Sequence, residues 1–68
     1  MTTTLTHDVL LNIHEVAART GLSRATIDRM RKRGNFPRPT LIGERCLRWS
    51  ANEIGLWIEE QLADRLAA

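Results

Sequence analysis

Residues 12–33 read NIHEVAARTGLSRATIDRMRKR, and the order of signals within them determines which fold the chain can adopt. The segment opens with a capping box, because the Asn12 side chain can accept an orphan backbone N–H while Glu15 reaches back to the cap. Apolar residues at helical spacing then predict a first helix over 13–19. Gly21 ends that helix, since glycine tolerates the left-handed conformation that closes a helix.

A second helix is predicted directly afterwards, over 24–33, with Ser23 as its cap. At about 100° per residue, Ile27 and Met30 point to the same side of this helix. The residues that point away from that side are Ala25, Asp28, Arg29 and Lys32. Two short helices joined by a turn that contains glycine form a helix-turn-helix, and its second helix is normally the one that enters the DNA major groove.

A β-hairpin over 39–49 is predicted after the second helix. Gly43-Glu44 is expected to form a tight turn of the II′ kind, which needs glycine at its first position. Alternation along the second strand places Leu47 and Trp49 on one face. A hairpin in this position is a wing, and Arg45 near its tip is expected to reach the adjacent minor groove or the DNA backbone.

A third helix is predicted over 51–66, where Ser50 and Glu53 form a second capping box. Its apolar stripe completes a core that draws on all three helices, the loop after the second helix, and the wing. The predicted core residues are Ile13, Val16, Leu22, Ile27, Met30, Phe36, Leu47, Trp49, Ile54, Trp57 and Ile58.

A chain of 68 residues makes one domain. We assign residues 9–66 to it and expect a mainly α fold with a small β-hairpin, that is, a winged helix-turn-helix. Residues 1–8 are polar and rich in threonine, so we expect a flexible N-terminal arm. The apolar run Val9-Leu10-Leu11 either adds a brief strand or leads into the first helix.

Charge is distributed unevenly along the chain, although the formal net charge is only +2. Residues 19–48 carry nine of the ten bases and a net charge of +7, whereas residues 1–18 carry −2 and residues 49–68 carry −3. The basic middle coincides with the predicted helix-turn-helix and wing, which favours a face that meets phosphate. A merely solvated basic surface is the alternative.

Other counts exclude whole classes of function. A single cysteine, Cys46, rules out an internal disulfide and a cysteine-based zinc site, and the two histidines have no carboxylates at metal-binding spacing. No nucleophile–base pair or carboxylate pair supports catalysis, so we expect neither an enzyme nor a cofactor or metal. No apolar run reaches the length of a membrane span and the start lacks signal-peptide features, so we expect a cytoplasmic protein without a membrane partner.

The predicted DNA contacts lie on the second helix, on the loop that follows it, and on the wing. Hydroxyl groups near a helix N-terminus suit phosphate oxygens, and arginine suits the guanine edge as a bidentate donor. The candidate DNA-binding residues are Ser23, Arg24, Ala25, Thr26, Asp28, Arg29, Lys32, Arg33, Arg38, Arg45 and Arg48.

Several motifs carry a resemblance to a known family. They include Thr20-Gly21-Leu22-Ser23-Arg24 at the turn, Phe36-Pro37-Arg38-Pro39 after the second helix, and Trp57-Ile58 in the third helix. Over about residues 9–60 the chain resembles the AlpA-type phage regulators, which belong with small excisionases in the MerR-like winged-helix superfamily. The resemblance implies a small DNA-binding protein of a prophage or integrative element. Many relatives have an aromatic residue where this chain has Asp28, which either accepts from a cytosine amino group or repels phosphate.

The resemblance implies two roles that share every residue named above. In the first, the protein is a recombination directionality factor, or excisionase, that binds attachment-site double-stranded DNA and directs an integrase toward excision. In the second, it is a transcriptional regulator at a promoter. A protein-interaction module with an acidic partner is a more distant alternative. Expected partners are double-stranded DNA, an integrase, and other copies of the chain bound head to tail through the basic middle and the acidic end. The chain is not itself a tyrosine recombinase, because it contains no tyrosine.

Overall fold

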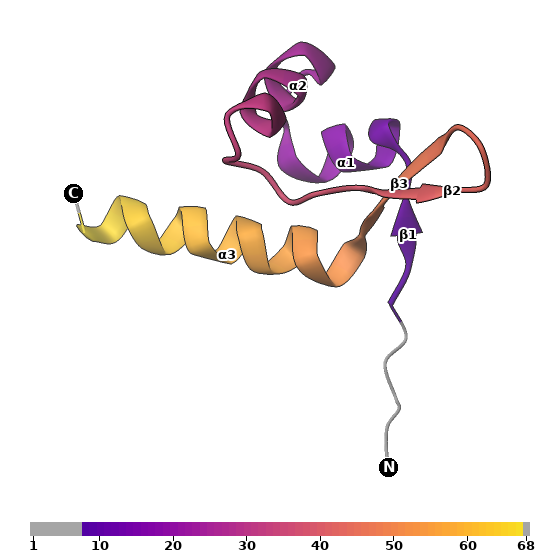
Figure 1. The fold of residues 1–68 in the computed structure, drawn as a ribbon. Helices are drawn as coiled ribbons and strands as arrows, with labels where there is room; N and C mark the ends of the chain where they lie inside the picture. Colours follow the sequence, from indigo (N-terminus) through magenta and orange to yellow (C-terminus); the bar gives the residue numbers. More distant parts are fainter. Residues whose placement is uncertain (1–7, 68) are drawn as a thin grey trace.

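The computed structural model describes residues 8–67, so residues 1–7 of the expected arm lie outside the described residues. Its elements are β1 (Leu10–Leu11), α1 (Ile13–Thr20), α2 (Arg24–Lys32), β2 (Thr40–Ile42), β3 (Cys46–Ser50) and α3 (Ala51–Ala67). The predicted fold class is confirmed, since three helices are combined with a small antiparallel sheet as in a winged helix-turn-helix. In Figure 1, α2 lies above α1, the β2–β3 hairpin projects to the right, and α3 runs out to the left.

Local capping signals place the two helices of the helix-turn-helix. Asn12 and Glu15 form the predicted capping box, with both backbone N–H to side-chain oxygen distances at 2.9 Å. Gly21 closes α1 at φ 75°, in the left-handed region where glycine is favoured. The Ser23 hydroxyl oxygen accepts from the Thr26 N–H at 3.1 Å and so begins α2. Compared with the predicted bounds, α1 ends one residue later, at Thr20. The second helix, α2, ends one residue earlier than predicted, because Arg33 forms its C-cap.

The three strands form one antiparallel sheet in the order β1-β3-β2. Of the two possibilities for the run before α1, the brief strand is the one the chain adopts, with Leu11 paired to Trp49. In the hairpin, Ile42 pairs with Cys46, which leaves a three-residue loop, Gly43 to Arg45. The expected two-residue turn is therefore wrong, although Gly43 does supply a positive φ of 66° at the first loop position. We call β2, β3 and this loop the wing.

Asp8 is fixed to the start of α3 rather than belonging to a flexible arm. Its carboxylate accepts a hydrogen bond from the Ser50 hydroxyl and a second, at 3.1 Å, from the Asn52 N–H. These two donors hold the pKa of Asp8 below its ordinary value of 3.8, so the carboxylate is charged at neutral pH. Ser50 also accepts from the Glu53 N–H at 3.1 Å, which is one of the two bonds of the predicted capping box. A carboxylate 42 residues away in sequence thus completes the cap of α3.

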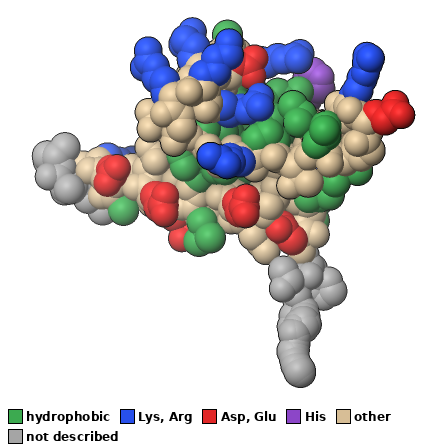
Figure 2. All heavy atoms as spheres, in the orientation of Figure 1, with side chains coloured by type: hydrophobic (Ala, Val, Ile, Leu, Met, Phe, Trp, Pro, Cys, Tyr) green, Lys and Arg blue, Asp and Glu red, His purple; other side chains and the backbone are tan. Residues whose placement is uncertain are grey.

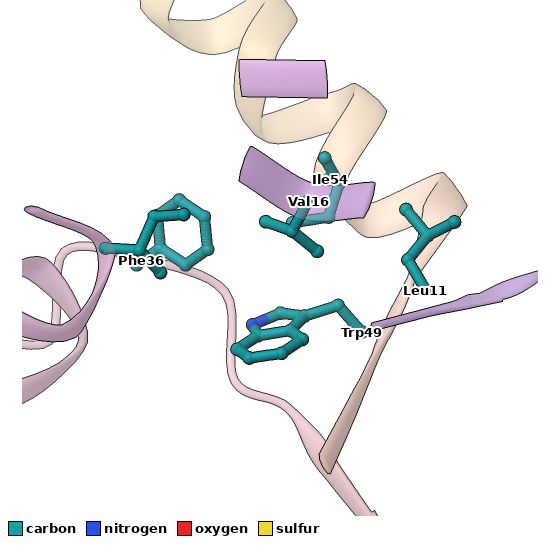
Figure 3. Close-up of a cluster of buried hydrophobic side chains, with 6 residues drawn as sticks. Leu11, Val16, Phe36, Trp49 and Ile54 are labelled. Atoms are coloured by element: carbon teal, nitrogen blue, oxygen red, sulfur yellow. The ribbon is translucent and has the colours of Figure 1, made fainter. Parts of the chain in front are cut away.

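The core lies where β1, β3 and the first halves of the helices meet. Its buried side chains are Leu11, Val16, Ile27, Phe36, Trp49 and Ile54, and Figure 3 labels the Trp49 indole together with Leu11, Val16, Phe36 and Ile54 near it. The other predicted core residues, except for Leu47, are partly buried and pack against this cluster. Leu47 is 38% exposed, so its placement in the core was wrong. It lies nearer the tip of the wing than Trp49, where it lines open hollows between the wing and α2. Leu11 was missed.

Two tryptophans position the loop that joins α2 to the wing. The Trp49 Nε1–H donates to the Pro37 carbonyl at 3.1 Å, and the Trp57 Nε1–H donates to the Asn35 carbonyl at 3.2 Å. Between these bonds, the Phe36 ring packs against Trp57 with centroids 4.8 Å apart. The loop is therefore attached to β3 and α3 at two carbonyls, and this attachment fixes the wing relative to α2. Within residues 8–67 no helix is both long and apolar enough to cross a bilayer.

Candidate nucleic-acid interface

Basic and acidic side chains gather on different parts of the molecule. In Figure 2, Lys and Arg side chains crowd over α2 at the top and appear at the wing on the right, whereas acidic side chains line α3 below. We define the basic face as the bases of α2, its C-cap, the following loop and the wing. These are Arg24, Arg29, Arg31, Lys32, Arg33, Arg38, Arg45 and Arg48.

The N-terminal half of α2 carries a hydrogen-bonded row of polar side chains. The Ser23 hydroxyl donates to the Thr26 hydroxyl at 2.9 Å, and Arg29 Nη2 donates to the same Thr26 oxygen at 3.3 Å. Ser23 and Arg29 are exposed, while Thr26 is half-buried. This row orders the Arg29 side chain along the surface of the helix. Arg24, Ala25, Lys32 and Arg33 are exposed as predicted.

Asp28 differs from the other residues predicted to face outward. It is half-buried, with its side chain 46% exposed, and its Oδ1 lies 3.5 Å from Nη1 of Arg31. Asp28 also lines the hollows that reach the wing, so its side chain borders the space between α2 and the wing. It lies outside the core cluster that contains Ile27 and Met30, in keeping with the predicted orientation, but the helical wheel does not indicate which flank of α2 faces the wing.

A groove runs between α2 and the wing, and two adjoining hollows make it up. One hollow lies against the loop after α2, and the other reaches the first turn of α1. Leu47 lines both hollows and Leu41 lines the first, which gives the groove an apolar wall on the wing side; apolar side chains are visible there in Figure 2. Its charged residues are six bases and one carboxylate, namely Arg24, Arg31, Lys32, Arg38, Arg45, Arg48 and Asp28.

The wing contributes bases of two kinds. Arg45 is exposed in the loop at the tip, as predicted. Arg48 is half-buried and donates from Nη1 to the Leu47 carbonyl at 2.9 Å, so its guanidinium follows the strand. Arg38, between two prolines, is exposed at the edge of the groove. Bases from separate parts of the chain thus border the same groove.

Almost none of this positive charge is paired with carboxylates in the described part of the chain. Between the described residues there is one salt bridge, Arg31 to Asp28, so the other seven bases of the basic face have no carboxylate partner there. Uncompensated bases around a groove form a surface suited to a polyanion. In the described part of the chain, no three His, Cys, Asp or Glu side chains gather as a metal site would require.

Sequence reasoning missed Arg31 and the apolar wall of the groove. Arg31 is absent from the predicted DNA-binding residues, and in the structure it lies over Trp49, with Cζ 5.5 Å from the ring centroid. Its spacing of three residues from Asp28 was the available signal, since side chains at that spacing share a helix face. The role of Leu41 could not be predicted, because it depends on how the wing is held against α2.

A recognition helix and a wing that border one uncompensated basic groove define the class: a winged helix-turn-helix DNA-binding protein. The chain belongs to the family described as prophage CP4-57 regulatory protein (AlpA), whose model matches residues 9–62. The resemblance drawn from the sequence motifs is thereby confirmed. Among curated proteins, the uncharacterized protein ORF88 of Enterobacteria phage P4 is 31% identical over 61 residues, which cover 90% of this chain and 69% of the relative. No solved structure matches the chain.

Proposed function

We propose that this protein is a sequence-specific DNA-binding factor of a prophage or mobile element that acts as a recombination directionality factor. It binds attachment-site DNA and directs an integrase toward excision. The observation that carries the DNA-binding part is the basic face, with seven bases that have no carboxylate partner among the described residues. Membership of a family of phage regulatory proteins supports the same class and agrees with a protein that is not an enzyme.

In the proposed complex, α2 enters the major groove and the wing follows the neighbouring backbone. Arg29, exposed at the end of the polar row on α2, meets base edges, because arginine can pair bidentately with guanine. The residues at the start of α2 lie against the sugar–phosphate backbone of the DNA; they are Ser23, Ala25 and Thr26. The bases of the loop and wing bind phosphates on either side and fix the register.

The directional role is proposed to come from DNA shape. A single small domain with one recognition helix reads few base pairs, so several copies are needed for specific affinity. Copies bound head to tail, with the acidic residues of α3 toward bases of the next copy's middle segment, residues 19–48, that do not contact DNA, extend along tandem sites. Such an array stabilises a bent arrangement of the attachment site that the integrase alone does not hold.

Transcriptional regulation at a promoter is the second candidate. The observation that favours it is the family's description as a regulatory protein. It uses the same surface, and the two roles can coexist in one protein. The difference lies in which DNA carries the tandem sites and in whether an integrase is needed for the effect.

An excision assay separates the two roles. Purified protein is added to an integrase from the same element and to that element's attachment-site DNA, and a reporter driven by the element's promoters is measured without integrase. We expect excision only when the protein is present, together with a cooperative ladder of shifted species on attachment-site DNA. A reporter response without any effect on excision contradicts the directional role. Independent, non-cooperative binding contradicts the head-to-tail array.

A further inference from the structure

The Asp28–Arg31 pair lies in the middle of the groove between α2 and the wing. Both side chains line both hollows of the groove, and they are 46% and 31% exposed respectively. Asp28 is the one carboxylate among six bases that line these hollows. A negative charge in the centre of a surface that otherwise attracts phosphate weakens that attraction, so the position of Asp28 requires an explanation.

Arg31 is held from two sides. Its Nη1 lies 3.5 Å from Asp28 Oδ1, and its Cζ lies 5.5 Å from the centroid of the Trp49 ring. The indole attracts a cation over its face. Trp49 is 2% exposed and bonded to the Pro37 carbonyl, so this surface is rigid. Among the described residues, Arg31 is therefore the one member of the basic face that has both a carboxylate partner and an aromatic surface.

We propose that Asp28 is a specificity-determining residue of the DNA interface and that it acts through Arg31. This inference rests on the proposed DNA-binding function. Asp28 keeps the Arg31 guanidinium against Trp49 and withholds it from the phosphates of DNA that lacks the correct sequence. Asp28 is thus a positioning residue for Arg31 as well as a repulsive charge in the groove.

The physical reason follows from where a DNA strand must run. With α2 in the major groove and the wing beside it, one sugar–phosphate strand crosses the groove between them. Phosphate attracts bases whatever the sequence, so each free arginine there raises affinity for all DNA alike. The Asp28 carboxylate opposes that gain because it repels phosphate. A hydrogen-bond donor on a base edge, such as the cytosine amino group, can offset this repulsion by donating to the carboxylate. Only a duplex of the right sequence presents that donor in register.

Asp28→Asn tests this proposal, because asparagine keeps the shape and removes the charge. Affinity is measured at several salt concentrations for two duplexes, one of random sequence and one enriched by the wild-type protein from a random library. On random duplex we expect binding to become about three- to tenfold tighter. We also expect the slope of log affinity against log salt concentration, here called the salt slope, to become steeper by about 0.9, the value for one added phosphate contact. On the enriched duplex we expect a change of about twofold or less, so the preference for it falls.

Two further variants assign the effect to Arg31. Arg31→Met retains an unbranched chain over Trp49 but leaves Asp28 without its partner, so we expect it to bind random duplex more weakly than the wild type, with a salt slope that is no steeper. In the double variant Asp28→Asn/Arg31→Met, the steeper slope should be lost. Thermal melting serves as the folding control, since a partly exposed pair at this spacing contributes little to stability.

Several results would overturn the proposal. They are an unchanged preference between the two duplexes in Asp28→Asn, a slope that steepens equally without Arg31, and a wild-type protein that enriches no sequence. A different result, in which neither the wild type nor any variant binds duplex DNA at low salt, contradicts the proposed function itself. The two failures are therefore distinguishable in one set of titrations.

Discussion

Replacing Trp49 with alanine is expected to unfold most of the protein at room temperature. Trp49 is 2% exposed and lies at the centre of the buried cluster, where its Nε1–H donates to the Pro37 carbonyl. Truncation of a buried tryptophan to alanine costs about 3–5 kcal/mol. The core of so small a domain supplies about 3–5 kcal/mol in total, so little stability remains.

The measurement is thermal melting by circular dichroism, with the fluorescence of Trp57 as a second probe. Trp57 is the only other tryptophan, so its signal in Trp49→Ala is free of overlap. Leu56→Ala is the matched control, because Leu56 is 60% exposed and its truncation should change stability by about 0.5 kcal/mol or less. The melting temperature of Trp49→Phe should lie between those of Trp49→Ala and Leu56→Ala. A Trp49→Ala protein that melts with the wild type would show that the cluster around Trp49 is not the core.

Replacing Arg29 with alanine is expected to weaken DNA binding about ten- to hundredfold, since loss of a bidentate arginine–guanine contact costs about 1–3 kcal/mol. Arg29 is exposed, makes one side-chain hydrogen bond, to Thr26, and has no carboxylate partner among the described residues. The fold does not depend on it, so the melting temperature should stay within a degree or two of the wild type. Fluorescence anisotropy with a labelled attachment-site duplex measures the affinity.

Arg65→Ala is the control for Arg29→Ala, because it removes the same charge from an exposed position on α3. If the basic face binds DNA, Arg65→Ala should bind almost as well as the wild type. Equal losses in both variants would mean that net charge, rather than this face, drives binding. Unfolding of Arg29→Ala would instead contradict the observed orientation of α2.

Signals carried by neighbouring residues predicted the helices well. The Asn12–Glu15 box and the Ser23 cap depend only on side chains within three residues, so they can be identified without any tertiary information. Gly21, which ends α1, is likewise a local signal that can be identified without tertiary information. These local features were sufficient for the helix-turn-helix, and the fold class followed from their order.

The errors concern features set by packing between distant segments. The turn of the wing was predicted one residue too short, because strand register, here Ile42 opposite Cys46, decides the loop length. Leu47 has the alternation of a core residue but lies where the wing extends past the core. The bond between Asp8 and Ser50 joins residues 42 positions apart, so no local pattern could reveal it. That Asp28 borders the wing likewise depends on tertiary packing, which no local pattern shows.

The salt dependence of duplex binding tests the basic face most directly. Each phosphate neutralised by a base contributes about 0.9 to the slope of log affinity against log salt. Seven bases of the face have no carboxylate partner among the described residues, and we expect four or more of them to contact phosphate. The predicted result for the wild-type protein is a slope of about −4 or steeper, which corresponds to about a hundredfold loss of affinity between about 50 and 200 mM salt. An affinity that is nearly independent of salt, or no binding at low salt, would contradict a DNA-binding face on α2 and the wing.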